Sequence, residues 1–92
     1  MVKLLKLLKI KIFGQVQGIG FRYSVARKAE ELSLKGFVRN EPDGSVYIEA
    51  EGAEEALEKL VNWCWEGTVI SSVAKVEIEE GDLKNFEDFQ VK

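Results

Sequence analysis

The residues with the clearest chemical potential lie together near the N-terminus, in a segment that runs from Gly14 to Arg22. Its glycines, Gly14, Gly18 and Gly20, have no Cβ, so successive backbone N–H groups can turn toward one point. An apolar helix pattern begins directly after the last glycine, and a helix N-terminus adds unpaired N–H donors and partial positive charge. The guanidinium of Arg22, in the first turn, can donate to two oxygens of a phosphate or carboxylate at once. This combination predicts a binding site for an anion.

Glycine spacing alone is a weak signal, and two better-known phosphate motifs are absent. The dinucleotide pattern G-x-G-x-x-G is not matched, because Tyr23 stands where its third glycine belongs. The sequence contains no Gly-Lys-Ser or Gly-Lys-Thr step, which excludes the phosphate loop of nucleoside triphosphatases. A tight connection between a strand and a helix, with no ligand, therefore remains an alternative interpretation of these glycines.

The residue types that are missing exclude several other chemistries. The 92 residues contain no histidine and one cysteine, Cys64. This excludes Ser-His and Cys-His nucleophiles, histidine metal ligands, an internal disulfide and a cysteine zinc cluster. The cysteine lies on the apolar face of a predicted helix, so we expect it to be a buried core residue. No metal site is evident, because the acids occupy predicted helix faces, helix starts and outward strand positions, as a solvated face would: Glu30, Glu31, Glu54, Glu55, Glu58, Glu79, Glu80 and Asp82.

The first strand is predicted from Leu8, where apolar and basic residues begin to alternate, with Leu8, Ile10 and Ile12 toward the core. Residues 1–6 are ambiguous between an extension of that strand and a mobile or helical start. Lysine recurs at every third position in this leucine-rich stretch, so we reject a secretion signal and a membrane-spanning helix. We therefore expect a cytoplasmic protein with no membrane partner.

The rest of the chain alternates between the two periodicities that distinguish helices from strands. Phe21, Val25, Ala29 and Leu32 recur at helical spacing and form one apolar stripe. The dipeptide Asp43-Gly44, after a proline, has the residue types of a tight hairpin turn. The predicted elements are helices at about 21–32 and 53–66, a hairpin over 37–50, a strand over 74–78 and a short last strand or edge over 86–91.

This order of elements, β-α-β-β-α-β, is that of the ferredoxin-like or split βαβ arrangement. It predicts an α+β sandwich in which an antiparallel sheet of four to five strands carries both helices on its apolar face. A chain of this length forms a single domain, residues 1–92. The fold hosts many functions, so the function must be argued from a site.

The charges are unevenly spread along the chain, although the net charge is only −3. Residues 1–29 carry seven bases and no acid, and all 16 acids follow them. A basic segment in an acidic protein favours a local anion site over a general affinity for nucleic acid. Alternatively, the two signs are mixed in space once the chain folds.

Two motifs together make the sequence recognisable. Gly14-Gln15-Val16-Gln17-Gly18-Ile19-Gly20-Phe21-Arg22, followed by Gly36-Phe37-Val38-Arg39-Asn40 and then Asp43-Gly44-Ser45-Val46, resembles the acylphosphatase family. The resemblance covers almost the whole chain. It implies a ferredoxin-like enzyme that hydrolyses the carboxyl–phosphate bond of acylphosphates, with Arg22 and Asn40 as catalytic residues. It also implies a loop whose backbone amides bind the phosphate, formed by Gln15, Val16, Gln17, Gly18, Ile19, Gly20, Phe21 and Arg22.

The chemistry of the implied reaction suits a chain without histidine. An acylphosphate has a carboxylate leaving group of low basicity, so its departure needs no general acid. The protein has only to hold the phosphoryl oxygens, neutralise their charge and aim a water molecule. Arg22 and the loop can do the first two, and the amide of Asn40 can fix the direction of a water by accepting one hydrogen bond and donating another. We expect no metal and no cofactor, and a monomer that meets small acylphosphates and inorganic phosphate.

Specific residues suggest two other functions. Lys35-Gly36-Phe37-Val38 resembles a fragment of an RNA-binding motif. However, the first strand presents lysines outward, Phe37 is a single aromatic and the chain is acidic, so we expect no nucleic-acid partner. A phosphate- or carboxylate-sensing domain that lost turnover is the second alternative, and the presence of both Arg22 and Asn40 argues against it. Arg39 is expected on the opposite strand face from Asn40.

Overall fold

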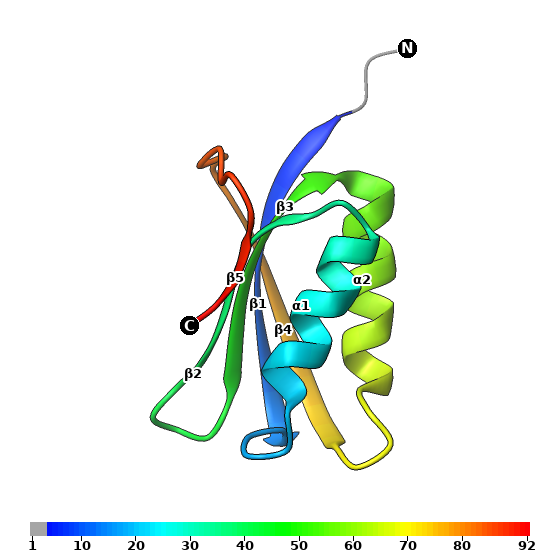
Figure 1. The fold of residues 1–92 in the computed structure, drawn as a ribbon, viewed down its shortest axis with the longest axis vertical. Coiled ribbons are helices and arrows are strands. Elements are labelled where there is room, and N and C mark those ends of the chain that lie inside the picture. The colour runs from blue at the N-terminus through cyan, green and yellow to red at the C-terminus, as the bar shows by residue number, and fades with distance from the viewer. Residues whose placement is uncertain (1–3) are drawn as a thin grey trace.

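The computed structural model describes residues 4–92 and contains two helices and a five-stranded sheet within them (Figure 1). Both helices lie on one face of the sheet, and the other face has no helix on it (Figure 1). The elements, in chain order, are β1 (Leu5–Gln15), α1 (Phe21–Glu31), β2 (Lys35–Asn40), β3 (Val46–Ala53), α2 (Glu54–Glu66), β4 (Ser72–Gly81) and β5 (Phe89–Val91).

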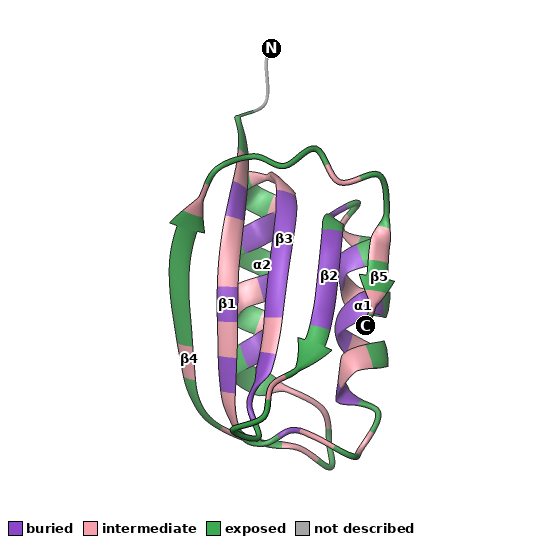
Figure 2. Cartoon of the chain, turned by 90° about the vertical axis from the view of Figure 1, so that its left-hand side faces the viewer, coloured by how far each residue is buried: buried purple, intermediate pink, exposed green. Residues whose placement is uncertain are grey.

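The strand order in the sheet is β4-β1-β3-β2-β5. The pairs β1–β3, β1–β4 and β2–β3 are antiparallel, which confirms the predicted ferredoxin-like α+β sandwich. The short β5 pairs parallel to β2, so the complete sheet is mixed. The reason is that β4 finishes at the end of the sheet where β2 starts, although the two strands are not neighbours. The connection crosses the sheet there, and the chain then runs in the direction of β2 (Figure 2).

The hydrophobic core lies between the sheet and the two helices, and the predicted periodicities place most of it correctly. Phe21, Val25 and Ala29 of α1 are buried, as expected from their stripe, whereas Leu32 lies just after the helix and is half-buried. Cys64 is buried on α2, and burial raises the pKa of its thiol to about 12, which keeps it an inert core group. The strand residues of this core are Ile10, Ile12, Val38, Val46, Ile48 and Ala50.

Two strand positions differ from the predicted pattern. Leu8 is only half-buried, whereas Leu7, on the opposite face of β1, is fully buried. The apolar residues of β4 are also less covered than expected, and Ile78 is 47% exposed. The second difference follows from position: β4 is an edge strand, so it has a neighbour on one side only. Leu5 and Lys6 extend β1, and residues 1–3 of the ambiguous start lie outside the described residues.

The sheet face without helices is partly covered by the segment that joins β4 to β5, and Glu51 holds that segment. Its carboxylate is 7% exposed. It accepts hydrogen bonds from the backbone N–H groups of Lys84 at 2.5 Å, Asn85 at 3.1 Å and Phe86 at 2.9 Å. Leu7 pairs with Glu51 in the β1–β3 ladder. It is therefore buried on this face next to the residue that anchors the segment.

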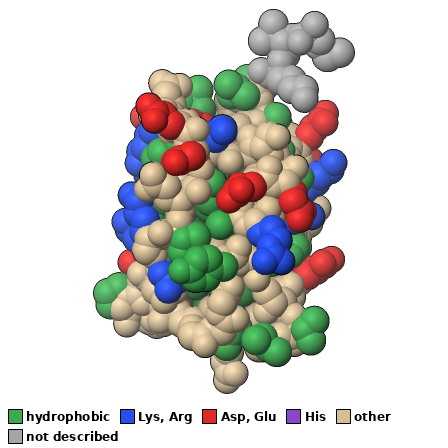
Figure 3. All heavy atoms as spheres, in the orientation of Figure 1, with side chains coloured by type: hydrophobic (Ala, Val, Ile, Leu, Met, Phe, Trp, Pro, Cys, Tyr) green, Lys and Arg blue, Asp and Glu red, His purple; other side chains and the backbone are tan. Residues whose placement is uncertain are grey.

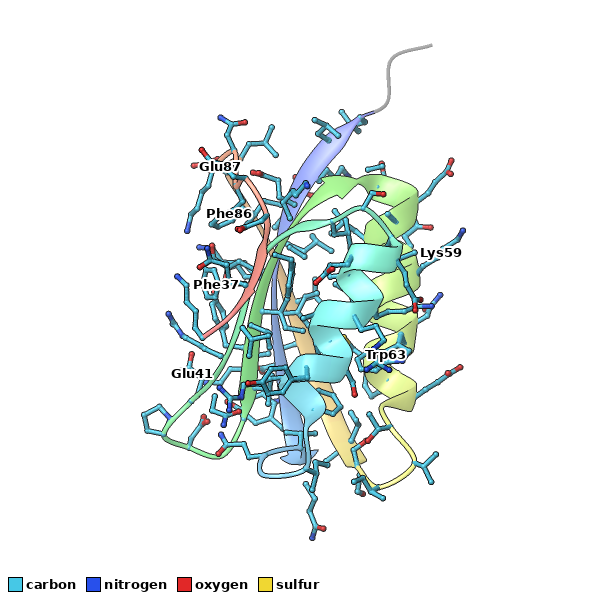
Figure 4. All side chains as sticks on the ribbon, in the orientation of Figure 1. Phe37, Glu41, Lys59, Trp63, Phe86 and Glu87 are labelled. Carbon is cyan, nitrogen blue, oxygen red and sulfur yellow. The ribbon has the colours of Figure 1, made fainter. Side chains whose placement is uncertain are left out.

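A second buried acid lies two residues before Glu51 on the same strand face. Glu49 accepts hydrogen bonds from the Nζ of Lys84 at 2.7 Å and from the hydroxyl of Tyr47 at 2.7 Å. Burial by itself would raise the pKa of Glu49, but these two hydrogen bonds and the positive charges of Lys84 and Lys9 together outweigh it and hold that pKa below its usual value. Burial and the neighbouring carboxylate raise the pKa of Tyr47. Phe37 packs between Tyr47 and Phe86, with ring centroids 6.0 and 5.9 Å away (Figure 4).

Removing the Glu51 carboxylate should destabilise the fold. In Glu51→Ala three backbone N–H groups lose their acceptor, and we expect the free energy of unfolding to fall by about 2 kcal/mol. Urea denaturation followed by circular dichroism measures this. Glu79→Ala is the matched control, because Glu79 is exposed and its side chain makes no hydrogen bond or ion pair within residues 4–92. Equal stabilities of the two variants would contradict an anchoring role for Glu51.

Candidate functional site

The two sequence motifs meet at one end of the sheet, where β1 and β2 finish. Strands β1 and β2 both pair antiparallel with β3, so they run in the same direction and end at the same edge. The loop from Val16 to Gly20 follows β1 there, and Asn40 is the last residue of β2. Figure 1 shows this loop and the β2–β3 connection side by side at the end of the molecule opposite to the start of β1.

The loop reaches the start of α1 through glycines in left-handed conformations. Gly18 has φ 77° and Gly20 has φ 75°, and residues with a side chain rarely adopt such angles. Gly20 is the N-cap of α1, has no side-chain capping bond and is followed by no acid in the first turn. Within residues 4–92 the backbone N–H groups from Gln17 to Arg22 donate to no other group. These donors and the helix dipole make the loop favourable for an anion.

Arg22 is the second residue of α1 and is half-exposed. Its Nη1 donates a 2.5 Å hydrogen bond to the backbone oxygen of Lys92, just after β5. The backbone N–H of Lys92 in turn donates to the oxygen of Val38 on β2, at 2.8 Å. Arg22 is therefore tied, through one residue, to the strand that carries Asn40.

Asn40 ends β2, where it is paired with Val46 of β3. It is exposed, and its side-chain amide makes no hydrogen bond within the described part of the chain. It shares a strand face with Val38, which is buried against the helices. Arg39 points to the other face, as predicted, with its guanidinium 4.8 Å from the ring centroid of Tyr47. Of these two neighbours, only Asn40 is on the face where Arg22 lies.

The turn after Asn40 is held by its own polar side chains. Asp43 accepts hydrogen bonds from the backbone N–H of Ser45 at 2.9 Å and from its hydroxyl at 2.5 Å. Lys11 of β1 approaches the same carboxylate to 3.1 Å. The hydrogen bonds from Ser45, with help from Lys11, lower the pKa of Asp43 to about 2. Asp43 therefore stays ionised at neutral pH and keeps the hydrogen bonds that hold the turn after Asn40.

A contact that the sequence did not reveal joins the loop to this turn. The side-chain Nε2 of Gln17 donates to the backbone oxygens of Glu41 and Ser45, both at 2.8 Å. The sequence motif predicts only a backbone amide donor at Gln17. The one sequence signal for this contact is that Gln17 is a polar residue between Val16 and Ile19, whose side chains pack with the core.

Of the six bases among residues 4–29, three form ion pairs with acids in the fold, namely Lys6, Lys11 and Lys28. Lys6 lies 3.6 Å from Glu54, and Lys28 lies 3.6 Å from Glu31. Figure 3 shows acidic and basic side chains interspersed on the side of the molecule where α1 lies in front and the sheet is seen nearly edge-on. Arg22 forms no ion pair with a side-chain carboxylate among residues 4–92. Half of the described bases of this segment are therefore paired with acids, whereas Arg22 is a local cation without a carboxylate side chain beside it.

Neither a metal cluster nor a spanning helix occurs in the part of the chain that the structure describes. No three acidic or cysteine side chains in residues 4–92 are grouped so that they could hold a metal ion. No helix there has the length and apolar composition needed to cross a membrane. The site thus offers an array of backbone donors, one guanidinium and one unengaged amide side chain, which suits binding an oxyanion next to an oriented water.

Comparisons with known proteins agree on one family. The family model for acylphosphatases matches residues 8–91. A curated acylphosphatase of Thermotoga petrophila is 46% identical over 88 residues, which cover 96% of this chain and 98% of that protein. One from Archaeoglobus fulgidus is 44% identical and covers 91% of this chain and 94% of its own. The solved structure of an acylphosphatase from Coxiella burnetii superposes with a TM-score of 0.92 at 38% identity, covering 96% and 93% of the two chains.

Proposed function

Because this chain belongs to the acylphosphatase family and hydrolyses the carboxyl–phosphate bond of acylphosphates, we propose that Arg22, Asn40 and the loop from Gln15 to Arg22 are its active site. The observation that carries this assignment is the run of unpaired backbone N–H groups from Gln17 to Arg22, beside a guanidinium that no carboxylate side chain neutralises. A dianionic phosphoryl group supplies the acceptors and the charge that this array lacks.

In the proposed reaction the loop amides and Arg22 hold the three non-bridging phosphoryl oxygens. Their hydrogen bonds and positive charge stabilise the negative charge that spreads over these oxygens in the transition state. Arg22 can engage two oxygens with its fork, and the helix dipole of α1 acts in the same direction. The phosphoryl group is thereby oriented with its bond to the acyl oxygen directed away from the loop.

Asn40 is proposed to orient the attacking water. Its amide oxygen accepts a hydrogen bond from the water, whose oxygen then forms a bond to phosphorus. The bond from phosphorus to the acyl oxygen breaks, and the carboxylate leaves with the electron pair and without a proton. The proton lost by the water passes to phosphate or solvent, because a side-chain amide is not a base. The exposed, unengaged amide of Asn40 supports this role.

We further propose a single-domain monomer of the cytoplasm that works on small acylphosphates without metal, cofactor or nucleic acid. Its open sheet face is poorly suited to stacking RNA bases. Phe37 is 7% exposed, lies between two other aromatic rings and has Lys92 4.3 Å above its ring centroid. A base has no free ring face there on which to stack.

Hydrolysis of benzoyl phosphate in excess EDTA tests the proposal. We expect turnover to be unchanged by EDTA. Inorganic phosphate should inhibit competitively, because it and the phosphoryl group of the substrate compete for the loop. p-Nitrophenyl phosphate is the control substrate, and it should turn over poorly because its leaving group is more basic. Phosphate binding without turnover would instead favour a sensing domain, and loss of activity in EDTA would overturn the metal-independent mechanism.

A further inference from the structure

Gln17 makes the hydrogen bonds that join the phosphate loop to the turn after β2. Its Nε2 donates to the backbone oxygens of Glu41 and Ser45, which are 24 and 28 residues away in sequence. Both distances are 2.8 Å, so both hydrogens of the amide nitrogen are engaged. Within the part of the chain that the structure describes, no other hydrogen bond crosses from this loop to this turn. Gln17 is therefore a specific link between two segments rather than a general packing residue.

The two acceptors are the groups that close the turn. The backbone oxygen of Glu41 also accepts from the N–H of Gly44 at 3.1 Å, and that of Ser45 accepts from the N–H of Glu41 at 2.9 Å. Glu41 directly follows Asn40 in the chain, and Figure 4 labels it on the connection between β2 and β3. Any displacement of Gln17 relative to this turn would thus move the end of β2 relative to the loop.

Such a link matters because the parts that it joins are otherwise held by different elements. The loop contains two glycines, Gly18 and Gly20, whose backbones have few steric restraints. Asn40 is exposed at the end of β2. Attack by water requires the oxygen held by Asn40 to lie in line with a phosphoryl group held by the loop. A displacement of about 1 Å in such an arrangement is enough to lower a rate by roughly 100-fold.

We propose that Gln17 is a positioning residue for acylphosphate hydrolysis, whose side-chain amide fixes the phosphate loop to the turn that directly follows Asn40. This inference rests on the proposed function of the loop and of Asn40. Because both Nε2 hydrogens are used, this nitrogen is not a phosphate ligand. Gln17 acts on the reaction through the geometry that it imposes on Asn40.

Two substitutions of similar length separate this role from simple packing. Gln17→Met fills the same space without a donor, and we expect kcat for benzoyl phosphate to fall by about 10-fold to 100-fold. The inhibition constant of inorganic phosphate should change by less than about threefold, because Arg22 and the loop amides remain. Gln17→Glu adds a pH-dependent readout. Its ionised carboxylate has no donor, whereas the protonated form can donate once, so its kcat relative to wild type should rise as the pH falls from 7 to 5.

A double-mutant cycle with Asn40→Ala tests the route of the effect. If Gln17 acts through Asn40, Gln17→Met should cause little further loss of kcat once Asn40 is gone. An equal loss in both backgrounds would overturn the proposal, as would an unchanged kcat or a proportional weakening of phosphate inhibition in Gln17→Met. Failure of the proposed function is distinguishable, because Asn40→Ala would then keep its turnover by itself. Thermal unfolding checks that the variants are folded, and for a poorly folded Gln17→Met the pH response of Gln17→Glu decides.

Discussion

Arg22→Ala should lower kcat/KM for benzoyl phosphate by about 100-fold or more. Arg22 is the one basic residue in the first turn of α1, directly after the loop. Within residues 4–92 no side-chain carboxylate neutralises its guanidinium. Its loss removes a charge-assisted, two-pronged contact with the phosphoryl oxygens. Since these oxygens are charged before and during the reaction, inhibition by inorganic phosphate should weaken together with turnover.

Two further variants make the result specific. Arg22→Lys keeps the charge but not the fork, so we expect an activity between those of wild type and Arg22→Ala. Arg27→Ala removes an exposed arginine of the same helix that lies outside the proposed site, and its activity should stay near that of wild type. Steady-state kinetics and phosphate inhibition measure all three. A loss in Arg27→Ala equal to that in Arg22→Ala would indicate a general charge effect and contradict the assignment.

The stability of Arg22→Ala needs a separate measurement, because Arg22 also holds the end of the chain. Its hydrogen bond to the Lys92 oxygen fixes the residue that follows β5, and Lys92 is bonded to Val38. Loss of this exposed contact should lower the free energy of unfolding by only about 1 kcal/mol. Activity measured well below the unfolding temperature therefore reports on phosphate binding rather than on the folded fraction.

Asn40→Ala should lower kcat by about 100-fold while leaving inhibition by inorganic phosphate almost unchanged. The physical reason is that Asn40 is proposed to hold the water and not the phosphoryl group. A residue that contributes only when the water attacks affects kcat and leaves ground-state binding intact. The pair of results, affinity lost in Arg22→Ala but kept in Asn40→Ala, divides the site into a binding part and a water-orienting part.

Arg39→Ala is the matched control for Asn40→Ala. Arg39 is the preceding residue, but its guanidinium lies over Tyr47 on the opposite face of the sheet. Its removal should leave turnover near normal. Asn40→Asp is informative too, since its charge should repel the phosphoryl group and weaken phosphate inhibition as well as turnover. If Asn40→Ala retained most of its kcat, the water would have to be oriented by another group.

Much of the fold could be predicted because it depends on local patterns. The alternation around Ile10 and Ile12 and the stripe of Phe21, Val25 and Ala29 specify which faces are buried, and the structure confirms them. The exceptions arise where neighbours decide burial. Ile78 has the alternation of a core strand but lies on an edge strand, and Leu7 is buried on the face that has no helix.

The candidate site divides in the same way. The glycine loop and Arg22 are contiguous in the chain, and the second motif ending at Asn40 is short, so their residue types are readable from the sequence. That the two motifs meet follows from the shared pairing of β1 and β2 with β3. Sequence reasoning left out Gln17 as a link, Lys92 as the partner of Arg22 and Glu51 as an anchor. Each acts through a hydrogen bond to backbone atoms, for which the partner's residue type carries no information.

By itself, therefore, the sequence determined the family, the order of elements and the residue types available for chemistry. These properties depend on side-chain periodicity, on missing histidine and on two short motifs. Only the tertiary structure decided how Arg22 reaches an oxygen 70 residues away, how Gln17 spans 24 and 28 residues, and why β5 runs parallel to β2. Such contacts form when the packing of helices on a twisted sheet brings distant backbone groups within about 3 Å, a distance that no local preference encodes.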